Sequence, residues 1–182
     1  ELIEQTGLDP SPALVTLDRS IAQGADVEPT AVDLARPLRG YLLHELIGEG
    51  SFGSVFRATQ PGVERDVAVK VIRAELADDR AFVRRFEAEA QLIARLEHPH
   101  IVPLYDFWRQ PGGAFLVFRL LRGGSAAALV TREGPVSVER AGAVLEQIGG
   151  ALGLAHGHGV IHRDVKPANV MREQGGRLVL MD

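Results

Sequence analysis

The chain has 182 residues, of which 46% are hydrophobic and 24% charged, with a net charge of −4; these values are typical of a globular protein and exclude a disordered or fibrous one. It contains no cysteine, which excludes disulfides, thiolate catalysis and Cys-ligated zinc. There is no apolar run of about 18 residues, no signal peptide and no basic patch within residues 41–182. We therefore expect a cytoplasmic protein with no membrane segment and no direct nucleic-acid contact through residues 41–182.

The first 24 residues predict a helix. Ser11 is a suitable N-cap, and Gly24 ends the helical pattern. The apolar face consists of Leu14, Leu17 and Ile21. Residues 7–14 resemble the tail of the helical transcriptional activator domain of multidomain bacterial regulators; an ordinary amphipathic helix from a neighbouring domain is the alternative. Residues 25–40 contain two prolines and little periodicity, which indicates a linker.

A glycine-rich stretch, Gly-Glu-Gly-Ser-Phe-Gly at residues 48–53, lies between strand patterns at residues 42–47 and 54–59. Dinucleotide-binding folds share this glycine spacing, but in them a helix follows the glycines directly. Residues 54–59 have no helical cap or apolar stripe, and a turn signal at residues 60–62 ends them. The pattern therefore predicts a hairpin whose backbone amides can face phosphate oxygens.

Lysine is rare in this chain, which has eighteen arginines and only two lysines, Lys70 and Lys166. Arginine cannot replace lysine where a compact point charge must meet phosphate oxygens. Lys70 lies among apolar neighbours in the strand pattern of residues 66–72. We interpret both lysines as functional; for Lys70, the alternative is an edge lysine that reaches water.

Residues 79–96 predict a helix with an apolar face. That face consists of Phe82, Phe86, Ile93 and Leu96. Glu89 falls on the same face, whereas Glu87 points the opposite way, toward solvent. A carboxylate on an apolar face needs a charged partner, and Lys70 is the only lysine upstream. We therefore expect an ion pair between Lys70 and Glu89.

The next segments alternate between strand and helix patterns. His98 and His100 mark the end of a helix, because no third histidine and no cysteine lies near enough in sequence to complete a metal site. Residues 114–118 predict a buried strand, and residues 126–132 and 138–156 predict helices. The buried stripe of the longer helix consists of Ala141, Val144, Ile148, Leu152 and Ala155.

Residues 162–169, His-Arg-Asp-Val-Lys-Pro-Ala-Asn, form a loop between two apolar pairs and gather five different polar groups. A simple turn would gain nothing from such a set. The run resembles the catalytic loop of protein kinases, His-Arg-Asp-x-x-x-x-Asn, at every fixed position. Lys166-Pro167 is similar to the serine/threonine class. Strand patterns at residues 170–172 and 178–180 follow and predict a hairpin.

The resemblance implies a role for each motif. Asp164 would accept the substrate hydroxyl proton, and Lys166 would neutralise charge on the transferred phosphoryl group. Lys70, paired with Glu89, would hold the α- and β-phosphates of ATP. The magnesium ligands would be Asn169 and Asp182. The nucleotide-binding residues would be Ile47, Gly48, Gly50, Phe52, Gly53, Val55, Ala68, Lys70, Phe118, Leu120, Leu121, Ser125 and Met171.

Within that pocket, Phe118 would limit the depth, and the Leu120–Leu121 backbone would meet the adenine edge. Arg119 departs from the acidic residue that many relatives have, so the contacts around it are an open point.

The resemblance also implies an α+β, two-lobed protein-kinase-like fold. We expect a five-stranded antiparallel sheet with one main helix, hinged to an incomplete helical lobe. The expected divisions are a domain tail at 1–24, a linker at 25–40, an N-terminal lobe at 41–118, a hinge at 119–125 and part of a C-terminal lobe at 126–182.

The implied reaction is transfer of the ATP γ-phosphoryl group, with Mg²⁺, to Ser or Thr of a protein substrate. Because Asp182 stands where the family's Asp-Phe-Gly begins, we expect a fragment of a longer protein with other domains, inactive when made alone. The alternative is a pseudokinase or nucleotide-sensing module of a multidomain transcriptional regulator. The presence of Lys70, Asp164 and Asp182 argues against it.

Overall fold

A computed structural model describes residues 38–50, 53–77, 80–110 and 113–181. The helix predicted within residues 1–24 and most of the predicted linker lie outside the described residues. Phe52 and Asp182, two of the expected site residues, also lie outside them.

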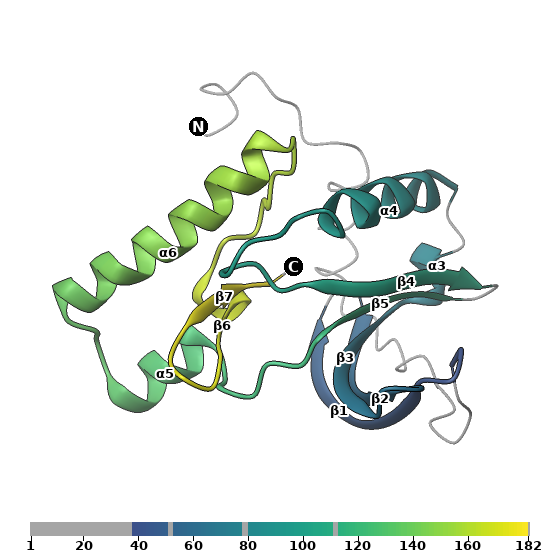
Figure 1. The fold of residues 1–182 in the computed structure, drawn as a ribbon, viewed down its shortest axis with the longest axis horizontal. Helices are drawn as coiled ribbons and strands as arrows, with labels where there is room; N and C mark the ends of the chain where they lie inside the picture. The colour runs from purple at the N-terminus through teal and green to yellow at the C-terminus, as the bar shows by residue number, and fades with distance from the viewer. Residues whose placement is uncertain (1–37, 51–52, 78–79, 111–112, 182) are drawn as a thin grey trace, which may run out of the picture. The chain divides into compact units, whose positions relative to one another are not determined.

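One five-stranded antiparallel sheet, in the order β1-β2-β3-β5-β4, dominates the N-terminal part of the described chain (Figure 1). Its strands are β1 (Leu42–Gly50), β2 (Gly53–Gln60), β3 (Arg65–Ile72), β4 (Leu104–Gln110) and β5 (Gly113–Arg119). Gly50 pairs with Gly53 across the first turn. The predicted strand–glycines–strand hairpin is confirmed, with β1 continuing through the first glycines rather than ending before them.

The side chains of strand β3 alternate between the two faces of the sheet. Val67, Val69 and Val71 pack on one face against an aromatic stack. Trp108 lies at the centre of that stack, with its ring 5.5 Å from Tyr41 and 4.9 Å from Phe115. Ala68 and Lys70 alternate with these valines and so belong to the opposite face, where Ala68 packs against Phe118.

The main helix of the N-terminal part is α4 (Arg80–Ile93), which follows the single turn α3 (Ala74–Ala77). Phe86 and Ala90 are buried on its inner side. The sequence predicted a helix to Leu96, but α4 ends three residues earlier, where Arg95 N–H donates to Leu92 and Leu96 N–H to Ile93 in tighter turns. The last turn of the predicted helix is therefore replaced by i→i+3 bonds of the 3-10 type, which are common at helix ends.

The C-terminal part contains α5 (Ala126–Glu133), α6 (Val138–Gly157), the 3-10 turn η1 (Pro167–Asn169), β6 (Val170–Arg172) and β7 (Leu178–Leu180). The Ser125 and Ser137 side chains cap α5 and α6 by accepting N–H bonds. Strands β6 and β7 form the predicted hairpin. Ile148 of α6 packs against that hairpin in a small buried cluster with Val170, Leu178 and Leu180, so α6 supports the strands that flank the 162–169 loop.

None of the helices in the described part of the chain combines the length and apolar character that a bilayer crossing requires.

Candidate active site

The loop at residues 162–169 brings three of the predicted site residues together. The Lys166 ammonium nitrogen lies 2.7 Å from Asp164 Oδ2. Asn169 Nδ2 donates to the same carboxylate oxygen at 3.0 Å and to the Asp164 backbone carbonyl at 2.9 Å. One exposed carboxylate is therefore oriented by a cation on one side and an amide on the other.

These contacts set the charge state of Asp164. The hydrogen bond from Lys166, followed by that from Asn169, holds the pKa of the Asp164 carboxyl below its ordinary value. The group therefore stays ionised at neutral pH, which a proton acceptor requires. Because both Asn169 bonds to Asp164 use Nδ2, its side-chain oxygen is not used in them and can serve as a ligand.

The β7 end of the chain holds this loop in place. His162 Nε2 lies 2.8 Å from the Met181 carbonyl, and Met181 N–H donates to the Asn169 carbonyl at 2.9 Å. Arg163 between them has a φ of 64°, in the left-handed region. Strained backbone conformations of this kind cluster at functional sites, where the surrounding contacts hold them in place.

The glycine hairpin leaves open space where a phosphate could approach. Among the described residues, a Cβ built on Gly50 meets no atom within 4 Å, and one built on Gly48 meets only the Val55 side chain, at 3.8 Å or more. Gly53 differs, because its φ is 152° and a Cβ there would collide with the Val71 carbonyl oxygen. Gly53 is therefore needed to close the hairpin, while the other two leave its surface clear.

Several predicted nucleotide-binding residues meet in one apolar cluster. Ala68 and Phe118 are buried in it, and Val55, Leu120 and Leu121 pack against them. Of the other expected residues, Ser125 forms an isolated β-bridge with Met171, Gly48 pairs with Val55, and Ile47 is exposed.

Sequence reasoning missed two members of the same cluster. Val179 is fully buried and Met181 packs against it. The continuous apolar run at residues 178–181 was the available signal, because an uninterrupted run of this kind fits a strand that is buried on both faces.

Glu89 differs from expectation. Its side chain is exposed, whereas the apolar pattern of the sequence placed it on the buried face. The buried side of α4 centres on Phe86 and Ala90, so Glu89 lies at its flank, about 100° around the helix from Ala90. Glu87 is exposed as expected, and its carboxylate lies 3.6 Å from Arg109 Nη1 of β4. The Lys70–Glu89 pair stays a prediction.

Comparison with known proteins identifies the family. The model of the protein kinase domain matches residues 41–182. The chain belongs to the protein kinase domain family. Its kinase domain is 41% identical over 131 residues to the serine/threonine-protein kinase PknE of Mycobacterium tuberculosis, covering 72% of this chain and 23% of PknE. The chain thus spans about a quarter of the length of the curated relatives it matches.

Solved structures agree on the fold. The kinase domain of Mycobacterium tuberculosis PknI superposes with a TM-score of 0.75 at 32% identity, covering 84% of this chain and 62% of that one. Rad53 residues 1–466, solved in complex with AMP-PNP, superposes with a TM-score of 0.70 at 26% identity, covering 78% of this chain and 38% of that one. The two-lobed kinase fold expected from the sequence, with an N-terminal antiparallel sheet and an incomplete helical lobe, is confirmed.

Proposed function

We propose that the protein is an ATP-dependent serine/threonine protein kinase, which transfers the ATP γ-phosphoryl group to Ser or Thr hydroxyls of a protein substrate. The observation that carries this proposal is the Asp164 carboxylate held between Lys166 at 2.7 Å and Asn169 at 3.0 Å. Phosphoryl transfer needs little covalent chemistry from the protein; it needs positioning and charge neutralisation. An oriented, ionised carboxylate beside an ammonium group suits both tasks.

Each residue then has a defined role. Asp164 orients the incoming hydroxyl and accepts its proton. Lys166 bridges from that carboxylate toward the phosphoryl oxygens, and Lys70, on the inner face of the sheet, holds the remaining phosphates with Glu89 as its partner. The glycine hairpin covers the phosphates, and the apolar cluster around Ala68 and Phe118 receives the adenine.

The chemistry of the donor set fits magnesium and ATP. Mg²⁺ prefers oxygen ligands, and one or two side chains usually hold it beside substrate phosphates; the Asn169 amide oxygen and the Asp182 carboxylate supply them. The metal would neutralise charge on the phosphates. The open space over Gly50 and the AMP-PNP bound by Rad53 support the nucleotide assignment.

We also propose domain divisions at residues 24, 40, 118 and 125, further domains in the whole protein, and a cytoplasmic location, where ATP is available. The resemblance of residues 7–14 to a transcriptional activator domain suggests that one partner domain is regulatory.

The decisive experiment separates phosphoryl transfer from nucleotide binding. In the full-length protein, Asp164→Asn should lower the transfer of labelled γ-phosphate to a generic Ser/Thr protein substrate by about 100-fold or more, because geometry survives without the proton acceptor. Binding of an ATP analogue should stay within about threefold of the unaltered protein, since the loop keeps its shape.

Glu139→Gln is a matched control, because Glu139 is an exposed carboxylate in the first turn of α6. It should leave both measurements unchanged. An Asp164→Asn protein that still phosphorylated at the original rate would exclude the proposed role, and an unaltered protein that bound the analogue without any transfer would favour the pseudokinase.

A further inference from the structure

Arg119, the residue at which the chain departs from many kinases, forms an ion pair across the hinge. Its Nη2 lies 3.0 Å from Glu173 Oε1. Arg119 is the last residue of β5, and Glu173 directly follows β6. The pair therefore joins the N-terminal sheet to the hairpin that carries the end of the 162–169 loop.

Burial makes this contact more than a surface ion pair. The Glu173 side chain is only 14% exposed, and its other oxygen lies 3.1 Å from Arg177 Nε. A carboxylate removed from water needs charged partners, and removal of one leaves it uncompensated. Exposed pairs contribute little by comparison, so Arg119 has a defined electrostatic task.

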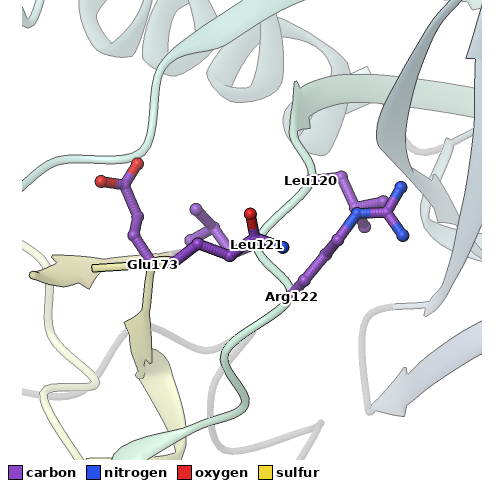
Figure 2. A pocket seen from close by; sticks show the side chains of 5 residues that line it. Leu120, Leu121, Arg122 and Glu173 are labelled. Atoms are coloured by element: carbon purple, nitrogen blue, oxygen red, sulfur yellow. The ribbon is translucent and has the colours of Figure 1, made fainter. Parts of the chain in front are cut away.

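A second, more exposed ion pair ties the hinge itself back to the N-terminal sheet. Arg122 lies beyond the adenine-facing residues, yet its Nη2 contacts Asp66 Oδ2 at the start of β3. Asp66 is also held at 3.1 Å by Arg57 of β2. Hinge and hairpin residues line a small pocket of about 280 Å³. Figure 2 shows the Arg122 and Glu173 side chains diverging on either side of Leu121.

The two ion pairs enclose Leu120 and Leu121. Backbone hydrogen bonds also tie the end of the hinge to β6. Gly123 N–H donates to the Arg172 carbonyl at 3.0 Å, and Arg172 N–H donates to the Gly124 carbonyl at 2.9 Å. Gly123 cannot be larger, because a Cβ there would collide with the Arg172 oxygen.

We infer that the Arg119–Glu173 and Arg122–Asp66 ion pairs, here called the hinge brace, have a positioning role. They fix the angle between the two lobes and the position of the Leu120–Leu121 backbone between them. Arg119 pairs with the C-terminal hairpin and Arg122 ties the hinge to the N-terminal sheet, so opening or twisting the lobes must stretch at least one pair. The consequence for nucleotide affinity rests on the proposed kinase function; the mechanical consequence does not.

The test measures the lobe angle directly in the full-length protein. Residues 1–182 contain no cysteine, so within them Val63→Cys and Glu139→Cys give a single pair of spin-label sites, both exposed and one on each lobe. The distance distribution between the labels should be narrow in the parent. It should broaden in Arg119→Gln and in Glu173→Gln, and stay narrow in Arg119→Lys, which keeps the charge.

A double-mutant cycle decides whether the pair itself is responsible. Arg119→Gln combined with Glu173→Gln should broaden the distribution no more than the worse single change, because both remove one interaction. Arg132→Gln is the matched control, since Arg132 pairs with Glu133 inside a single helix. The proposed brace would be wrong if the label distances were unchanged in both single variants. It would also be wrong if the broadening in the double variant were the sum of the two single effects.

A parallel titration with an ATP analogue links the brace to function. Arg119→Gln and Glu173→Gln should each raise the dissociation constant by about threefold to tenfold, non-additively, while kcat at saturating ATP changes less than KM. If the parent binds no nucleotide, the proposed function fails, yet the label distances still decide the brace. A narrow distribution with unchanged affinity in both variants would show that the pair positions nothing.

Discussion

At the scale of single residues, two glycines that face each other across one turn do different work. Gly50 pairs with Gly53 in the β1–β2 hairpin. The space beside Gly50 is open, so glycine there permits a close approach by a ligand. Gly53 instead has a φ of 152° and lies against the backbone of β3, with the Val71 carbonyl carbon 2.9 Å from where a Cβ would be.

The two positions should therefore respond differently to alanine. Gly53→Ala should lower the free energy of unfolding by about 2 kcal/mol or more, because the new methyl group collides with backbone that cannot give way. Gly50→Ala should leave the stability within about 0.5 kcal/mol of the parent. Urea unfolding of both variants measures the difference, and equal stabilities would contradict the assignment.

At the scale of elements, α6 acts as the support of the catalytic loop. It contributes Ile148, which is 6% exposed, to the cluster with Val170, Leu178 and Leu180. These three residues belong to the β6–β7 hairpin, which holds His162 and Asn169 through Met181. The sequence predicted this stripe from its helical period, because the spacing of the stripe depends only on local geometry.

Shortening Ile148 should therefore loosen the support without touching the site. Ile148→Ala should cost about 2–4 kcal/mol of unfolding free energy through the cavity it leaves. Leu145, three residues earlier and 73% exposed, gives the comparison: Leu145→Ala should cost less than about 0.5 kcal/mol. Chemical denaturation followed by far-UV circular dichroism checks both values, and an equal loss in the two variants would contradict the described packing.

At the scale of the whole molecule, local motifs could be predicted from the sequence and long-range partners could not. Asp164, Lys166 and Asn169 lie within six residues, so their spacing brings them together by itself. The exposure of Glu89 depends on which side of α4 meets the sheet, a choice made by Phe86 and Ala90. No sequence pattern links Arg119 to Glu173, because the helices α5 and α6 separate these two residues along the chain.

The strand order of the sheet has a consequence for how the protein folds. The β1–β2–β3 meander and the β4–β5 hairpin each form from neighbouring strands, but they join only along β3 and β5. The α4 helix lies in the connection between the two pieces, so this seam closes a long loop. Long-range pairing of this kind is intrinsically slow, because loop-closure entropy is lost before the contacts form.

We therefore expect the amides that bond β3 to β5 to gain protection last in pulse-labelled hydrogen exchange during refolding, after those within the meander and the hairpin. Simultaneous protection of all five strands would contradict this order. Val69 and Val117, both fully buried, face each other at the seam. Ala68 and Phe118 are the next pair along it, so the apolar cluster around these two residues should be among the last features to appear as the chain folds.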